Sequence, residues 1–187
     1  MEDYSSTELK AKYLKYYVGV ATLGLAGEGL SRVPDAVIEL SEVQGLGLRK
    51  NKLRKLPTSI NKLNRLEVLH LDKNNLVELP PEIGDLKELL WLSLSNNQLV
   101  GLPTSIQKLN RLQWLLLDAN NLTELPAEIG DLKELRELSV SDNQLVCLPT
   151  SIQKLNRLQD LYLDGNKLTE LPAEIGDLKG AAGAECE

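Results

Sequence analysis

Residues 102–124, LPTSIQKLNRLQWLLLDANNLTE, decide the fold, because this 23-residue unit recurs along the chain in both directions. The regular copies begin at Leu56, Leu79, Leu102, Leu125, Leu148 and Leu171. A repeat with a fixed period of this length is typical of solenoids, in which each copy forms one turn and packs against the next. The sequence therefore predicts a stack of turns.

Two degenerate copies precede the regular ones. Residues 33–55 keep the pattern with Val33-Pro34 in place of Leu-Pro, and residues 18–32 keep only the part expected to form a strand. The shared pattern, LPxxIxxLxxLxxLxLxxNxLxx, resembles the leucine-rich repeat family over roughly residues 18–179. The 23-residue LPxxI form is similar to intracellular members such as the Ras-suppressor, Scribble-type and plant Ras-group-related proteins. The resemblance implies an α/β solenoid, a right-handed horseshoe arc with a concave parallel β-sheet and short 3₁₀ or helical turns on its convex side.

The positions inside one unit have separate structural tasks. The LxxLxL segment alternates inward leucines with outward variable residues, as in a strand with one buried face. The repeated Asn, for example Asn97 or Asn120, follows the strand, and its amide is expected to bond backbone groups that would otherwise be buried unpaired. The Pro at the second position sets φ before a short turn that directs an Ile and a Leu inward.

The chain divides into four parts. Residues 1–17 are predicted to form an N-terminal capping helix, helical over 6–17, with Ser5 and Glu8 as a capping box; a partner-binding helix is the alternative. Residues 18–55 are the degenerate repeats, residues 56–179 are the regular repeats with the last one half complete, and residues 180–187 are predicted to be a disordered tail. Because the pattern stops in mid-turn, the strand within residues 158–163 is expected to be a sheet edge.

Regular units alternate between two kinds, which gives a super-repeat of 46 residues. Units of the LPTSI kind begin at Leu56, Leu102 and Leu148, and units of the EIGDL kind begin at Leu79, Leu125 and Leu171. Convex stripes of Lys and Arg should therefore lie beside stripes of Glu and Asp. Exposed ion pairs contribute at most about 1 kcal/mol each, so these stripes are expected to help fix the order of the turns without dominating stability.

Charge and composition argue against several function classes. The net charge of −6 and the pI near 5.0 disfavour nucleic acid and anionic lipid as partners. The basic segment 49–55 consists largely of repeat positions and is interpreted as an ordinary turn, not a nuclear-import motif. No apolar run is long enough to span a bilayer, and the first residues do not resemble a signal peptide. Only Cys147 and Cys186 occur, which favours a reducing compartment, so we expect a cytoplasmic protein without a membrane partner.

No catalytic or metal-binding constellation is predicted. His70 is the only histidine, and the repeat pattern places no Ser or Cys nucleophile beside a histidine except at the strand that carries His70 itself. Asp72, Asp118 and Asp164 follow alternate strands, so they should lie about 10 Å apart, too far to share one ion. They are interpreted as solvated loop acids. We therefore expect no enzymatic activity, no metal and no cofactor.

The copies differ from one another mainly on the expected concave face. Residues 102–133 and 148–179 differ only as Trp114/Asp160, Leu116/Tyr162, Ala119/Gly165 and Asn121/Lys167, all within the strand or just after it. Residues 56–78 and 102–124 differ at six positions, three of them in the same columns, whereas exposed convex positions such as Lys62 and Asn64 are unchanged. This concentration favours diversification for recognition; chance substitution after a recent duplication is the alternative.

The variable positions form two columns across the predicted sheet. Trp91 and Trp114 should be neighbours and, with Leu116 and Tyr162, should make an exposed apolar centre with an acidic flank, as at an interface hot spot. Exposed aromatic side chains are also common without any function. The candidate partner-binding residues are Val68, His70, Trp91, Ser93, Trp114, Leu116, Glu137, Asp160 and Tyr162.

The predicted function is non-enzymatic protein recognition by the concave face, in intracellular signalling or scaffolding. The resemblance suggests a small GTPase or a signalling kinase as the partner. The alternative is a structural role, either as a fragment of a larger multidomain receptor or scaffold, or as a unit that assembles through its last strand. The expected oligomeric state is accordingly a monomer or an edge-paired dimer.

Overall fold

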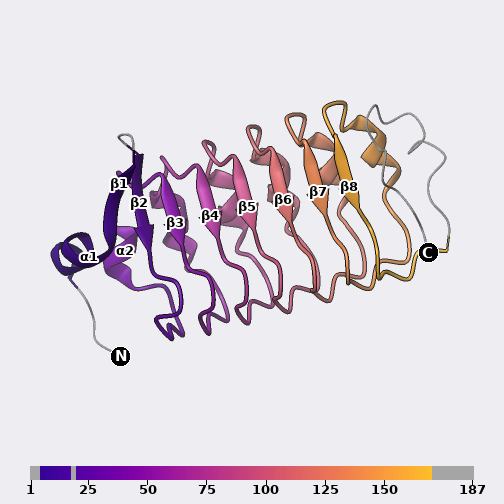
Figure 1. Cartoon of the computed structure of the whole chain (residues 1–187). Coiled ribbons are helices and arrows are strands. Elements are labelled where there is room, and N and C mark those ends of the chain that lie inside the picture. The colour runs from indigo at the N-terminus through magenta and orange to yellow at the C-terminus, as the bar shows by residue number, and fades with distance from the viewer. Residues whose placement is uncertain (1–4, 18–19, 170–187) are drawn as a thin grey trace.

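The computed structural model of the chain describes residues 5–17 and 20–169, which form one arc-shaped solenoid (Figure 1). Eight strands make a single sheet in chain order. They are β1 (Leu14–Tyr17), β2 (Val20–Gly24), β3 (Gly45–Gly47), β4 (Val68–His70), β5 (Trp91–Ser93), β6 (Trp114–Leu116), β7 (Glu137–Ser139) and β8 (Asp160–Tyr162). From β2 to β8 the strands are parallel, as predicted, and successive regular units pair position by position, so Trp91 lies opposite Trp114. The predicted half turn after residue 169 and the predicted disordered tail lie outside the described residues.

Short helical turns form the convex side, behind the sheet in Figure 1. They are α2 (Asp35–Ile38) and the 3₁₀ helices η1 (Thr58–Lys62), η2 (Pro81–Asp85), η3 (Thr104–Lys108), η4 (Ala127–Asp131) and η5 (Thr150–Lys154). Each begins directly after the proline that recurs at the second position of its unit. Pro103, for example, has φ −69° and ψ 146°. Proline holds φ near this value, so the residue fixes the entry of the chain into the turn. No helix among the described residues is long and apolar enough to cross a membrane.

The core is a continuous column of aliphatic side chains between the sheet and the convex turns. The middle residue of each short parallel strand, such as Leu92 or Leu115, is fully buried, and so is the Ile of each 3₁₀ turn, such as Ile106. Each of these side chains contributes about 1.5–3 kcal/mol by burial. Because the same side chain recurs at the same position, the turns stack evenly. The residues on either side of each middle leucine lie on the face of the sheet that points away from the core. This is the face predicted to be concave, and we call it the outer face of the sheet.

The repeated asparagines connect neighbouring turns, as predicted. Asn97 accepts a hydrogen bond from the backbone N–H of Leu76 (3.0 Å) and donates through Nδ2 to the carbonyl oxygens of Leu71 (3.0 Å) and Leu94 (2.8 Å). The same pattern is formed by Asn51, Asn74, Asn120, Asn143 and Asn166. These amides pair backbone groups that would otherwise be buried without partners, so their role is structural.

The N-terminal cap differs from the prediction. Helix α1 (Ser6–Tyr13) begins at the predicted capping box, in which Ser5 N–H donates to Glu8 Oε2 (2.8 Å) and Glu8 N–H donates to Ser5 Oγ (3.3 Å). The hydrogen bonds from Ser5 lower the pKa of Glu8. The predicted helix over 6–17 is wrong for its last four residues, which form β1 antiparallel to β2. Tyrosine favours extended backbone, and β1 pairs an edge of β2 that would otherwise be open.

The 46-residue alternation has a packing basis on the convex side. Gly84 of η2 lies so close to the next turn that a Cβ atom there would be 2.9 Å from the carbonyl carbon of Ser105, and Gly130 of η4 has the same relation to Ser151. The predicted ion pairs between stripes are also present, including Arg111 with Glu88 and Arg157 with Glu134. The glycine in a unit of the EIGDL kind thus makes room for the serine in the following unit of the LPTSI kind.

The residue before each repeated asparagine has left-handed backbone geometry. These residues are Lys50, Lys73, Asn96, Ala119, Asp142 and Gly165, with φ between 53° and 67°. This geometry changes the interpretation of the Ala119/Gly165 difference. Glycine adopts positive φ at no steric cost and alanine does not, so the Ala119/Gly165 difference has a backbone explanation that does not require diversification for binding.

Candidate functional site

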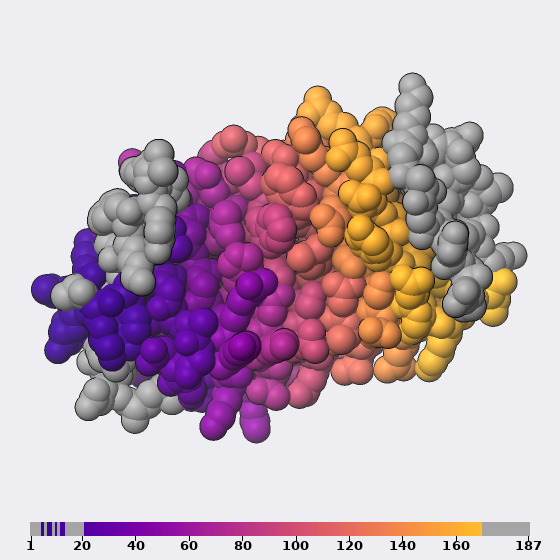
Figure 2. Space-filling view, in the orientation of Figure 1, coloured from indigo at the N-terminus to yellow at the C-terminus, as the bar shows by residue number. Residues whose placement is uncertain are grey.

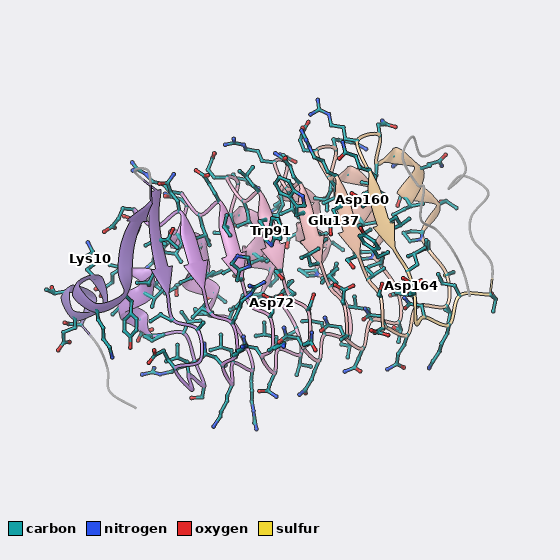
Figure 3. All side chains as sticks on the ribbon, in the orientation of Figure 1. Lys10, Asp72, Trp91, Glu137, Asp160 and Asp164 are labelled. Atoms are coloured by element: carbon teal, nitrogen blue, oxygen red, sulfur yellow. The ribbon has the colours of Figure 1, made fainter. Side chains whose placement is uncertain are left out.

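An aromatic cluster lies at the centre of the outer face of the sheet. The rings of Trp91 and Trp114 stack with centroids 5.3 Å apart and an interplanar angle of 28°. His70 packs edge-on against Trp91, with ring centroids 6.1 Å apart. All three side chains are half-buried. The predicted neighbourhood of the two tryptophans on this face is confirmed. Strands β4, β5 and β6 hold these three side chains, which we call the aromatic cluster, and Figure 3 labels its middle member, Trp91.

The other predicted residues surround the aromatic cluster at different depths. Val68, Leu116 and Glu137 are half-buried, whereas Asp160 and Tyr162 are exposed. Parallel register places Val68 beside Trp91, Leu116 beside Ser93, and Asp160 beside Glu137. Strands β4 to β8 are adjacent in chain order, and in Figure 2 the colours of this side of the molecule accordingly run in sequence from magenta to yellow.

Ser93 is the exception among the predicted binding residues, since its exposed fraction is zero. It lies between His70 and Leu116 in the register of the sheet, and both neighbours are larger. Its hydroxyl donates a hydrogen bond to Asp72 Oδ1. The prediction that Ser93 contributes to the contact surface is therefore wrong, and its equivalent Ser139 is buried for the same reason.

Two of the repeated aspartates organise this layer and are not solvated loop acids as predicted. Asp72 is buried and accepts hydrogen bonds from Ser93 Oγ and from Arg49 Nε (2.5 Å). Asp118 accepts from Ser139 Oγ, from Ser95 Oγ (3.1 Å) and from a backbone N–H (3.1 Å). Only Asp164 is exposed. The signal in the sequence was the alternation of Asp in one turn with Ser in the next, which places a hydroxyl donor beside each carboxylate.

Burial and nearby charges shift two pKa values on this face. Burial is the main cause that lowers the pKa of His70; Arg49 acts in the same direction and Asp72 opposes it. His70 is therefore neutral at pH 7. Burial also raises the pKa of Glu137, and the nearby carboxylates of Asp160 and then Asp118 add to the effect.

The polar groups around His70 do not form a nucleophile and its base. The hydroxyl of Ser93 donates to Asp72, so its proton is not directed at the imidazole. His70 Nδ1 lies 4.0 Å from Asp72 Oδ2, which is longer than a hydrogen bond. Within residues 5–17 and 20–169 no group of His, Cys, Asp or Glu side chains could hold a metal ion. The side chains around His70 are therefore better suited to contact with a partner surface than to nucleophilic catalysis.

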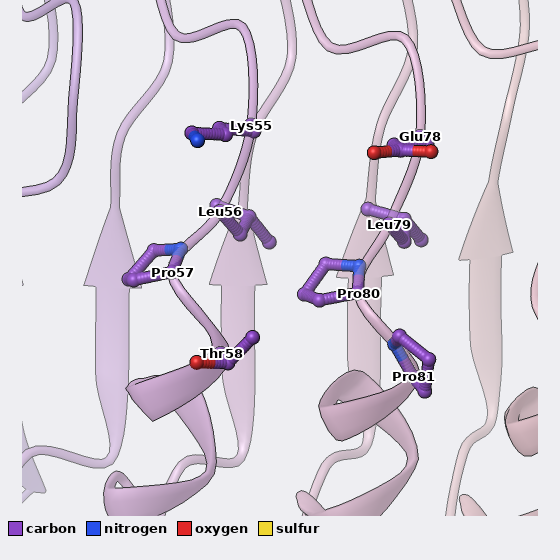
Figure 4. Close-up of a pocket in the computed structure, with 8 residues that line it drawn as sticks. All are labelled: Lys55, Leu56, Pro57, Thr58, Glu78, Leu79, Pro80 and Pro81. Carbon is purple, nitrogen blue, oxygen red and sulfur yellow. The ribbon is translucent and has the colours of Figure 1, made fainter.

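One groove lies away from this face. It encloses about 530 Å³ between the Leu-Pro segments of two neighbouring turns, residues 55–58 and 78–81. Figure 4 shows these segments and the short helical turns in front of the strands. The groove therefore lies on the side of the solenoid that carries the helical turns, and the aromatic cluster lies on the opposite side of the sheet. Its only charged side chains are Lys55 and Glu78, and it holds none of the predicted binding residues.

Comparisons with known proteins agree with this geometry. A family model described as a leucine-rich repeat region matches residues 69–139 and 111–180. The chain is similar to a leucine-rich-repeat protein of Leptospira interrogans, with 35% identity and a TM-score of 0.64 over 82% of this chain and 45% of that one. It is similar to the plant peptide hormone receptor RGFR1 in complex with RGF2, with 36% identity and a TM-score of 0.73 over 80% of this chain and 25% of that one.

A third similar structure is the leucine-rich-repeat ectodomain of the plant membrane receptor kinase GASSHO1/SCHENGEN3 from Arabidopsis thaliana, in complex with Casparian strip integrity factor 2. It shares 32% identity, with a TM-score of 0.69 over 80% of this chain and 22% of that one. The chain spans less than half the length of each of these structures. A search of curated proteins finds no match. The matched repeats cover more than half of the sequence, and the chain belongs to the leucine-rich repeat family.

Proposed function

We propose that this chain is a non-enzymatic recognition module that binds a segment of a protein partner on the outer face of β4 to β8. The observation that carries the proposal is the stacked pair Trp91 and Trp114, half-exposed on an otherwise regular sheet. Tryptophan is enriched among residues that dominate binding free energy, especially near the centre of an interface. The exposed side chains of Asp160 and Tyr162 supply a more polar border on one side.

The rigidity of the sheet supports this role. Fully buried leucines and the asparagine hydrogen bonds fix the backbone beneath the aromatic cluster. A surface that is already ordered avoids part of the entropy cost of association, which for each immobilised side chain is about 0.5–1.5 kcal/mol. The stack itself contributes about 0.5–1.5 kcal/mol and keeps both indoles in one orientation.

The similar structures support a peptide or protein as the partner. Two of them are receptors determined in complex with RGF2 and with Casparian strip integrity factor 2. The resemblance to intracellular repeat proteins makes a small GTPase or a signalling kinase our candidate source of the segment, in a scaffold or signalling role in the cytoplasm. The free thiol of Cys147, which is exposed, is compatible with a reducing compartment.

A random peptide library displayed on phage tests the proposal. Peptides selected on the unmodified chain should lose binding to the double variant Trp91→Ser/Trp114→Ser and keep binding to the convex control Lys62→Ser/Asn64→Ser. Both control residues are exposed and lie outside the sheet. Circular dichroism checks that each variant is folded, and Leu116→Ser replaces the double variant if that protein does not fold. Selected peptides that bind the tryptophan variant as tightly as the unmodified chain would overturn the proposal.

A further inference from the structure

We propose that the segment bound on this face carries an arginine next to an apolar side chain, with the guanidinium between Glu137 and Asp160 and the apolar group on Trp114. The inference rests on the proposed function and adds the chemistry and the direction of the partner. Three observations carry it: the row of side chains across three strands, the unpaired carboxylates in that row, and the change of charge along the sheet.

The row follows from the register of the sheet. Trp114 of β6 lies opposite Glu137 of β7, and Glu137 lies opposite Asp160 of β8. Figure 3 shows Trp91, Glu137 and Asp160 along one line across the strands. Neighbouring strands lie about 4.8 Å apart, so an apolar surface changes into an acidic one within the width of one side chain.

The carboxylates of this row differ from those on the convex side. There, Glu88 is paired with Arg111 and Glu134 with Arg157. Among the described residues, Glu137 and Asp160 have neither an ion pair nor a hydrogen bond to their side chains. Burial raises the pKa of Glu137, and repulsion by the carboxylate of Asp160 adds to the effect. A cation placed between them would relieve this repulsion.

Arginine fits the row better than lysine does. A guanidinium is planar, can bond a carboxylate through two N–H groups, and stacks on an aromatic ring while it does so. The ring of Trp114 and the carboxylate of Glu137 are neighbours in the register, so one guanidinium could contact both. An apolar side chain one or two residues away in the segment would then lie over Trp114, Trp91 or Leu116.

The charge changes sign along the array, which gives the segment a direction. On the N-terminal side, Lys50 and Lys73 are exposed in the turns that follow β3 and β4. On the C-terminal side, Asp142, Asp160 and Asp164 are exposed. Lys50 and Lys73 would repel a uniformly basic segment near β3 and β4. The basic group of the partner therefore belongs over β7 and β8.

The test compares peptides selected from the same phage library. The pool selected on the unmodified chain should be enriched in arginine within two positions of an apolar residue. For a selected peptide, measured by fluorescence anisotropy, changing that arginine to glutamine should weaken binding at least tenfold. On the variant Glu137→Gln/Asp160→Asn the arginine and glutamine peptides should bind equally, and on Glu137→Lys/Asp160→Lys a glutamate peptide should bind better than the arginine peptide. The matched control Glu78→Gln/Glu124→Gln removes the same charge from exposed positions off the row and should change nothing.

The outcomes separate the inference from the proposed function. Peptides that need Trp91 and Trp114 but show no arginine enrichment, or whose affinity changes less than twofold on Glu137→Gln/Asp160→Asn, would overturn the inference and leave the proposed function standing. Peptides that need neither tryptophan would overturn the proposed function. If no peptide binds the unmodified chain, both fail.

Discussion

The substitution Gly84→Ala tests the packing of one convex turn against the next. Gly84 does not have positive φ, so alanine is compatible with its backbone, and any cost comes from space. The new Cβ would lie 2.9 Å from both the carbonyl carbon and the Cβ of Ser105, and closer still to the carbonyl oxygen. Carbon atoms in contact are normally about 3.5–4.0 Å apart, so η2 and η3 must separate by about 1 Å.

The expected loss of stability follows from that separation. Forced overpacking costs about 1–3 kcal/mol, and the upper half of the range applies because the opposing atoms are mostly backbone and cannot rotate away. Opening the interface also strains the hydrogen bond from Lys87 Nζ to Lys108 O (3.2 Å), which joins the two turns. With a urea m-value of about 2–3 kcal/mol/M, a loss of about 2–3 kcal/mol lowers the unfolding midpoint by about 1 M.

Urea unfolding followed by circular dichroism measures this midpoint, and the chain contains a matched control. A Cβ at Gly101 would meet nothing within 4 Å, so Gly101→Ala isolates the effect of alanine on the unfolded chain, which is a gain of about 0.4–1 kcal/mol at most. Gly130→Ala repeats the test, because Gly130 has the same contact with Ser151. If Gly84→Ala and Gly130→Ala unfold at the same urea concentration as Gly101→Ala, the packing argument is refuted.

Three other changes test the hydrogen bonds and charges. Asn97→Ala should lower the free energy of unfolding, measured in urea, by about 3 kcal/mol, because three buried backbone groups lose their hydrogen-bond partner. The loss should be larger than that of Asn166→Ala, because the side chain of Asn166 is only half-buried, and equal losses would contradict this. The lowered pKa of His70 means that the unfolded chain takes up a proton before the native one, so stability should fall as pH drops through 6.5 and below, and His70→Gln should reduce that fall between about pH 7.5 and 5.5. The raised pKa of Glu137 changes stability with pH in the opposite direction. The contribution of Glu137 to the free energy of unfolding is present at low pH and is lost as pH rises through its raised pKa. Glu137→Gln should therefore stabilise the chain at about pH 7 and not at about pH 3.5. A difference that does not depend on pH would contradict either charge prediction.

The repeat made the core and the tryptophan pair predictable. Side chains in a strand alternate between two faces, so once the leucines of a turn are assigned inward the residues between them must face outward. A strict period then places equivalent residues side by side, and Trp91 therefore had to meet Trp114. Neither step depends on detailed packing, which is why one sequence was enough.

Other features depend on interactions that periodicity does not describe. Residues 14–17 have helix-compatible spacing, but the unpaired edge of β2 competes for them and gives β1. Ser93 occupies an outward column, yet side-chain length decides burial, and a serine between His70 and Leu116 is covered. The left-handed geometry at Ala119 leaves no trace in the hydrophobic pattern.

The fit between unlike turns limits how a gene for this array can change length. Removing only residues 102–124 would place Gly84 against Glu128 instead of Ser105, and would leave the hydroxyl of Ser139 facing Ser95 instead of the carboxylate of Asp118. Removing two successive units restores both pairings. Unequal recombination within such a gene should therefore be tolerated in steps of 46 codons, and an engineer who lengthens the array should insert turns two at a time.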